Sequence, residues 1–226
     1  MADRMFLCRQ SRAKNIAKKL ASLFPKASIA LYFSTPWELV VAVMLSAQTT
    51  DKKVNEVTPV LFKKYKTIKD YALADKKELE RVIKSIGLYK TKAKNIIHCA
   101  DILLKKYNGA LPHTMEELTA LPGIGRKTAN IILGNAFGIV EGIAVDTHVR
   151  RLAIKFDLTS STNPDRIEKD LMELFSKKEW LVLTYRFIEY GRTICPARKH
   201  DCSKHPLTKL YPPAANIWFS PSKNKK

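Results

Sequence analysis

The spacing of apolar residues is the feature that most constrains how this chain folds. Apolar side chains recur three and four positions apart over most of the sequence, which is the period of an amphipathic helix. Alternation of apolar and polar residues, which is typical of strands, is almost absent. The sequence therefore predicts an all-α protein, with helices over residues 37–47, 54–65, 78–86, 93–104, 115–121, 128–137, 148–156, 166–175 and 179–190.

Capping and breaking residues agree with these limits. Thr114 followed by Glu117 fits a capping box at the start of the helix that leads to residue 121. The basic N-terminus is interpreted as a first helix of the fold, with an organelle-targeting role as the open alternative. Residues 211–226 are rich in Pro, Ser, Asn and Lys, so we expect a loosely packed tail there.

Charge and cysteine content narrow the class of protein. A formal net charge of +19 favours a polyanionic partner such as nucleic acid, although a lysine-rich codon bias gives the same excess without any function. Four cysteines without a secretion signal indicate a reducing compartment rather than a disulfide framework. No apolar run is long enough to cross a membrane, so we expect no membrane partner.

Residues 121–130, Leu-Pro-Gly-Ile-Gly-Arg-Lys-Thr-Ala-Asn, form a glycine turn that leads into a helix. Pro122 ends the preceding helix, and Gly123 and Gly125 allow another backbone to approach closely. Amides at the positive end of a helix bind phosphate, whereas a plain helix-turn-helix connection uses glycine for steric reasons alone. Lys127 in the first helical turn is either a phosphate contact or a nucleophile that forms a Schiff base with deoxyribose C1′.

Asp146 precedes a helical pattern in Ala-Val-Asp-Thr-His-Val-Arg. Aspartate is a preferred N-cap, and a cap leaves one carboxylate oxygen that can stabilise an oxocarbenium-like sugar. His148 is interpreted as a structural residue or a DNA-backbone contact rather than a catalytic base. Upstream, Ile86-Gly87 followed by Lys92 is a second short glycine turn with a lysine close behind. It is either a second turn that binds DNA backbone or a second use of the same hairpin geometry.

These residues, together with Leu-Ser-Ala-Gln-Thr-Thr-Asp at 45–51 and Ile-Gly-Leu-Tyr at 86–89, closely resemble the endonuclease III family of helix-hairpin-helix DNA glycosylases. The resemblance extends from about residue 12 to residue 205. It implies a two-lobed all-α fold with a DNA-binding cleft between the lobes and a flipped-out nucleotide. The expected parts are a six-helix lobe over 29–140, a second lobe from 1–28 and 141–210, and a tail over 211–226.

The resemblance also implies a base-excision repair enzyme. Lys127 matches the family's Schiff-base nucleophile and Asp146 its catalytic acid, which implies removal of oxidised pyrimidines followed by β-elimination 3′ to the abasic site. Gln48 matches a residue that fills the gap left by the flipped base, and Leu88 matches a wedge in the opposite strand. The residues expected to contact DNA are Gln48, Leu88, Gly123, Gly125, Arg126, Thr128, His148 and Arg198.

Related adenine-specific glycosylases lack the lysine and carry an additional C-terminal domain, so the resemblance favours a DNA glycosylase that is also an abasic-site lyase. The alternatives are a non-catalytic helix-hairpin-helix module and a monofunctional glycosylase for uracil or mismatched thymine. The expected partner is double-stranded DNA that contains damaged bases or abasic sites. A monomer in a prokaryotic cytoplasm, associated with the nucleoid, is the corresponding expectation.

One part of the family pattern is incomplete. The family's Cys-x6-Cys-x2-Cys-x5-Cys motif ligates a [4Fe-4S] cluster, and here its four places hold Cys195, Cys202, His205 and Tyr211. Two thiolates cannot supply four ligands, so we expect no cluster and a loop without metal. The alternative is a zinc site formed by Cys195, His200, Cys202 and His205. Without metal, packing must hold the lobe together, with Trp180, Tyr185, Phe187 and Tyr190 as candidates.

Overall fold

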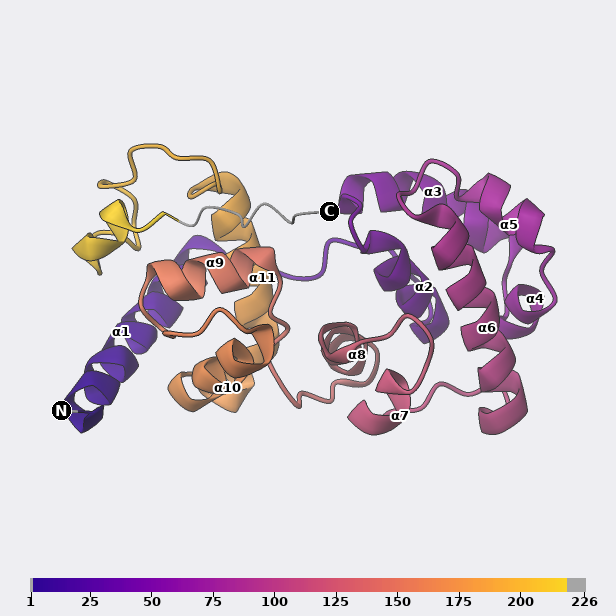
Figure 1. The fold of residues 1–226 in the computed structure, drawn as a ribbon, viewed down its shortest axis with the longest axis horizontal. Helices are drawn as coiled ribbons and strands as arrows, with labels where there is room; N and C mark the ends of the chain where they lie inside the picture. The colour runs from indigo at the N-terminus through magenta and orange to yellow at the C-terminus, as the bar shows by residue number, and fades with distance from the viewer. Residues whose placement is uncertain (1, 219–226) are drawn as a thin grey trace. The chain divides into compact units, whose positions relative to one another are not determined.

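The computed structural model describes residues 2–218, and within this range every regular element is helical (Figure 1). The all-α prediction is confirmed, and each of the predicted ranges contains a helix. The chain divides into two compact units, one formed by Met1–Ser28 with Gly142–Lys226 and the other by Ile29–Glu141. The division falls close to the predicted lobe limits at residues 28 and 140.

The unit formed by Ile29–Glu141 contains seven α-helices and one π-helical turn among its described residues. The helices are α2 (Pro36–Ser46), α3 (Asp51–Lys64), α4 (Ile68–Ala72), α5 (Lys76–Val82), α6 (Tyr89–Tyr107), α7 (Met115–Thr119) and α8 (Arg126–Ile132), and the π-helical turn is η1 (Leu133–Phe137). Helix α4 was not predicted because five residues are too few for a periodic pattern. Its capping box, Thr67 with Asp70, is a signal that could have identified it.

Helix α2 lies at the centre of this unit. Its residues 39–45 are all buried, because α3, α6 and α8 pack around it. A helix that is apolar on all sides is stable only in such an interior position. Helix α6 also packs against α4 and α5, while α8 packs against α7. The two helices that follow the glycine turns, α6 and α8, are thus both anchored on α2.

The other unit joins the start of the chain to its last third. Its elements are α1 (Ala2–Leu23), α9 (Thr147–Lys155), α10 (Pro164–Leu174), η2 (Lys177–Glu179), α11 (Trp180–Thr193) and η3 (Pro212–Asn216). Helix α11 packs against α9 and α1, and α10 packs against the same two helices. Of the four aromatic residues expected to pack here, Phe187 and Tyr190 are fully buried and Tyr185 is buried, while Trp180 is half-buried.

Two arginines attach α1 to this unit. Arg9 and Arg12 both form ion pairs with Asp157, at 2.7 and 2.9 Å, and Arg12 also donates to the carbonyl of Phe156. Burial raises the pKa of Asp157, but the two guanidinium groups outweigh it and lower that pKa overall. The basic N-terminal helix is therefore part of the fold.

A loosely packed tail was predicted over residues 211–226. Residues 211–218 are packed: Ala214 is fully buried, and the Tyr211 ring lies 4.0 Å from the Arg12 guanidinium carbon. The prediction was wrong for this stretch because its apolar side chains are covered by the unit that contains α1 and α9. Residues 219–226 lie outside the described residues. Among those described, no helix combines the length and apolar character needed to span a bilayer.

Candidate functional site

The turn between α7 and α8 has the geometry that its glycines predicted. Gly123 has a φ of +80°, and a Cβ there would lie 2.9 Å from Met44 and 3.0 Å from Asn95, so only glycine fits without a shift. Gly125 is different, because a Cβ there would meet nothing within 4 Å. It is the N-cap of α8 and has no side chain to make a cap. Its glycine leaves open space at the start of the helix.

Lys127 is the second residue of α8, and its side chain is exposed beside exposed Arg126. Thr128 is half-buried, and Ala129 and Asn130 turn into the core. The α-helical part ends at Ile132, and the predicted helix continues to residue 137 as a π-helical turn. The lysine thus stands on a helix whose next turn is fixed by core packing, with its amine accessible to a substrate.

Asp146 is the N-cap of α9. Its Oδ1 accepts a hydrogen bond from the Val149 amide at 2.8 Å, and its backbone is extended, as an N-cap requires. The side chain is half-buried rather than enclosed. The second carboxylate oxygen takes no part in the cap. Both interpretations of Asp146 are therefore compatible with the geometry, since one oxygen caps and the other remains available for chemistry.

His148 lies in the first turn of α9 and packs against α11. A Cβ added to Gly191 of α11 would meet His148 Nδ1 at 2.5 Å and Arg151 Nη2 at 3.0 Å. The imidazole therefore occupies the space that Gly191 leaves. This close packing supports the structural interpretation of His148.

Gln48 and Leu88 share an unusual backbone conformation. Their φ angles are +54° and +58°, in the left-handed region that is costly for residues with a side chain. Both residues are exposed, and 56% of the Leu88 surface is accessible although the side chain is fully apolar. Strained, exposed residues of this kind cluster at binding sites. The wedge and gap-filling roles that the resemblance implies require this exposure.

The two segments that carry these residues are adjacent. A Cβ added to Gly87 would lie 3.4 Å from the Gln48 carbonyl oxygen and 3.6 Å from Thr49 Oγ1. Lys92, in the first turn of α6, holds the segment that carries Gln48 in place. Its ammonium donates to the carbonyls of Leu45 and Ala47, at 2.8 and 2.5 Å, and to Thr49 Oγ1 at 3.1 Å.

Lys92 corrects one sequence-based interpretation. The repeated glycine-turn pattern placed Lys92 as a possible counterpart of Lys127, but only 5% of its surface is accessible. Burial lowers its pKa to about 8. Its amine is directed at the end of α2, so Lys92 is not a counterpart of the exposed Lys127. Local sequence patterns do not predict these hydrogen bonds, because the acceptors lie more than forty residues upstream of Lys92.

The loop after α11 carries Arg198, which is exposed as a DNA contact would require. The family's cluster does not fit this loop. Cys195 and Cys202 are both buried thiols, but an imidazole occupies the third ligand position and a phenol ring, held under Arg12, occupies the fourth. Burial raises the pKa of Cys195, and the nearby Lys155 and Arg151 oppose that effect.

The predicted site residues belong to both units. Gln48, Leu88, the glycine turn and Lys127 lie in the unit formed by Ile29–Glu141, while Asp146, His148 and Arg198 lie in the other. Lys92 is the residue that sequence reasoning missed as a support of the site. Lys92 follows the Ile86-Gly87 turn in the sequence, but that position does not predict its burial.

Comparisons with known proteins identify the family of this chain. Residues 41–177 match the family described as HhH-GPD superfamily base excision DNA repair protein. The chain is 43% identical to endonuclease III of Synechocystis sp. over 93% of its own length and 96% of that protein. It also resembles a solved non-covalent endonuclease III–DNA complex, with a TM-score of 0.86 and 41% identity over 92% of this chain and 97% of the other. A trapped endonuclease III–DNA covalent intermediate matches with a TM-score of 0.83 and 42% identity, over 89% and 94%. On these grounds the chain belongs to the HhH-GPD superfamily of base excision DNA repair proteins and, within it, to the endonuclease III family.

Proposed function

We propose that this base excision repair DNA glycosylase is bifunctional: it removes oxidised pyrimidines from duplex DNA and then cleaves the strand 3′ to the abasic site. The observation that carries the proposal is the exposed Lys127 on the first turn of α8, directly after a glycine turn that leaves space for a backbone. A non-catalytic DNA-binding module needs no amine at this position. The covalent DNA intermediate of a relative at 42% identity supports a covalent route here.

The proposed reaction uses the amine as a nucleophile. The uncharged amine of Lys127 attacks deoxyribose C1′ while the N-glycosidic bond breaks and its electron pair leaves with the base. Loss of the proton from the nitrogen and opening of the sugar ring give an imine. Removal of a C2′ proton then expels the 3′ phosphate by β-elimination, and water hydrolyses the imine to free the lysine.

Asp146 would assist the first step. As positive charge develops on the sugar, its carboxylate stabilises the oxocarbenium-like transition state and accepts the proton that the lysine must lose. The cap to Val149 holds the carboxylate in one orientation, so little ordering remains to be done during the reaction. A group oriented by its own helix is well suited to that role.

Gln48 and Leu88 would hold the DNA open. Extrusion of a nucleotide costs a few kcal/mol of stacking and pairing, and it is easier for a damaged base. An exposed leucine inserted between base steps and an amide in the vacated position both compensate for part of that cost. The hydrogen bonds of Lys92 keep the two residues in a fixed mutual arrangement before DNA binds.

The test is to trap the covalent intermediate. The protein is incubated with duplex DNA that contains a single thymine glycol, and borohydride is added to reduce any imine. We expect a stable protein–DNA adduct with wild type and none with Lys127→Ala. Lys94→Ala is the matched control, because Lys94 is an exposed lysine of the same unit and carries no proposed chemistry.

Three results would contradict the proposal in different ways. Tight DNA binding without an adduct or a nick would indicate a binding module. Base release that persists in Lys127→Ala, with no strand cleavage by wild type, would indicate a monofunctional glycosylase. An adduct with uracil or mismatched thymine but none with thymine glycol would leave the lyase in place and refute the substrate class.

A further inference from the structure

Three metal-binding side chains meet in the loop that follows α11. Cys195 Sγ and one ring nitrogen each of His200 and His205 all lie within 4.8 Å of one another. Around a tetrahedral zinc ion, with bonds of about 2.0–2.3 Å, such donor atoms are about 3.3–3.8 Å apart. Small side-chain rotations close that difference. We propose that Cys195, His200 and His205 bind a zinc ion in place of the family's iron–sulfur cluster.

The orientation of His200 supports the proposal. Its Nδ1 lies 2.6 Å from the backbone carbonyl of Arg198, an arrangement in which Nδ1 carries the proton and donates it. That tautomer leaves the lone pair on Nε2. Histidines that bind metals are typically fixed in this way, by donating the other ring N–H to a carbonyl or carboxylate.

Two buried nitrogens in the cluster lack a partner. His200 Nε2 and His205 Nδ1 are both inaccessible to solvent, and neither makes a hydrogen bond to any residue within the described range 2–218. A buried polar atom without a hydrogen-bond partner destabilises the folded protein. A metal ion bound to both nitrogens removes this cost at two places. The ring centroids of His200 and His205 lie 5.1 Å apart, and the ring centroid of Trp218 lies 5.0 Å from that of His200.

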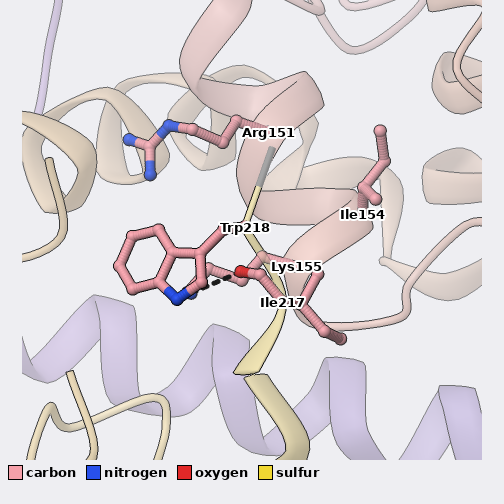
Figure 2. Close-up of a pocket in the computed structure, with 5 residues that line it drawn as sticks. All are labelled: Arg151, Ile154, Lys155, Ile217 and Trp218. Atoms are coloured by element: carbon pink, nitrogen blue, oxygen red, sulfur yellow. Dashed lines mark hydrogen bonds between the residues drawn. The ribbon is translucent and has the colours of Figure 1, made fainter. Parts of the chain in front are cut away.

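The neighbouring cations do not occupy the donor atoms. Lys155 donates to the carbonyl of Ile217 at 2.8 Å and lies 3.9 Å from the centre of the Trp218 ring (Figure 2). Arg151 reaches the carbonyls of Gly191 and Pro196. Its distance of 4.0 Å to Cys195 Sγ is long for a hydrogen bond, so the sulfur remains able to coordinate.

The donor set selects zinc among the common metals. One sulfur and two imidazoles match the ligand preference of zinc, whereas magnesium and calcium prefer oxygen. The fourth position takes the Cys202 thiolate or a water molecule. Cys202 is buried nearby, with its sulfur 4.0 Å from the Ala215 carbonyl oxygen. The ion would tie together residues 195–205 and so fix the exposed segment that carries Arg198.

The test measures metal binding by the full-length protein. The protein is purified without added metal, stripped with a chelator, and titrated with Zn²⁺ alone and with Co²⁺ as a coloured substitute. We expect one ion per chain and a cobalt–thiolate absorption band. Cys195→Ser should lose that band, and His200→Asn and His205→Asn should each weaken zinc binding by at least tenfold.

Matched controls separate the site from general effects. Cys8→Ser and His98→Asn remove an exposed thiol and an exposed imidazole elsewhere, and both should bind zinc as wild type does. If Cys195→Ser does not fold, His200→Asn on the loop serves as the test, with folding checked by circular dichroism. The proposal is overturned by less than one zinc in ten chains, by zinc binding that the histidine variants leave unchanged, or by an iron–sulfur absorption band.

Discussion

Replacement of Lys92 by methionine tests whether the two DNA-probing segments are held by a buried ammonium. Methionine is similar in length and apolar, so it fits the site but provides no donor. The carbonyl of Leu45 is buried, and loss of its donor costs about 1–3 kcal/mol. Loss of the donor to the Ala47 carbonyl and to Thr49 Oγ1 destabilises the fold less, because both atoms are partly accessible and water can replace the amine. Removal of a buried charge offsets part of the loss.

The expected net effect of Lys92→Met is a loss of about 2 kcal/mol in the free energy of unfolding, or about 4–8 °C in Tm for a chain of this size. The preference for lesion-containing over undamaged duplex should fall about tenfold, which corresponds to about 1.4 kcal/mol. Binding to undamaged DNA should change little. Thermal unfolding and competition binding measure the two effects, with exposed Lys94→Met as the control for loss of one positive charge.

The pH dependence provides a sharper criterion. Burial lowers the pKa of Lys92 to about 8 in the folded protein, from an ordinary value of 10.5. Between these values the unfolded chain binds the proton and the folded chain does not, so stability due to this group rises with pH. The stability difference between wild type and Lys92→Met should therefore widen from about pH 8 to pH 10.5. A constant or shrinking difference, or an unchanged lesion preference in the variant, would refute the reasoning.

Substitutions at three other positions have separable outcomes. Asp146→Asn keeps a good N-cap, so it should unfold like wild type but lose base release. Asp146→Ala removes the cap as well, so it should lose both base release and about 1 kcal/mol in the free energy of unfolding. Glycosylase assays and denaturation measure the two effects. Leu88→Gly should raise the free energy of unfolding, measured in urea, by up to about 1 kcal/mol, because glycine adopts φ +58° without strain. The same variant should lose lesion-specific binding. A loss of stability would contradict the strain argument. Gly191→Ala should lower the free energy of unfolding by about 1–3 kcal/mol, since its Cβ would lie 2.5 Å from His148, and unchanged stability would show that the imidazole can move.

Several structural features could be inferred from local signals. Helix positions follow from the period of apolar residues, which depends on neighbours three and four positions apart. The roles of Pro122 and Gly123 in the turn follow from backbone sterics that are specific to proline and glycine. The N-cap role of Asp146 is local as well, because donor and acceptor are three residues apart. The glycine turn, the cap and the family motifs were therefore accessible without coordinates.

Features that depend on distant partners were not accessible. Lys92 and Lys127 each follow a glycine turn, and only the packing of α6 on α2 decided that the Lys92 amine is buried while Lys127 is exposed. The packing of residues 211–218 was not predicted for the same reason. The apolar residues there have no periodic pattern of their own, and their order comes from contacts with Arg12 and Lys155, which lie far away in the sequence.

The sequence by itself determined the all-α class, the endonuclease III family and the residues that carry the proposed chemistry, because each depends on local patterns or on motifs of fixed spacing. The tertiary structure decided what supports those residues and what the altered cysteine loop can hold. The metal-binding atoms of Cys195, His200 and His205 lie within 4.8 Å of one another because of how the loop folds, and the spacing of these residues in the sequence does not specify that. The physical reason is that burial and side-chain direction are set by the whole fold, whereas capping, turns and periodicity are set by neighbours in the chain.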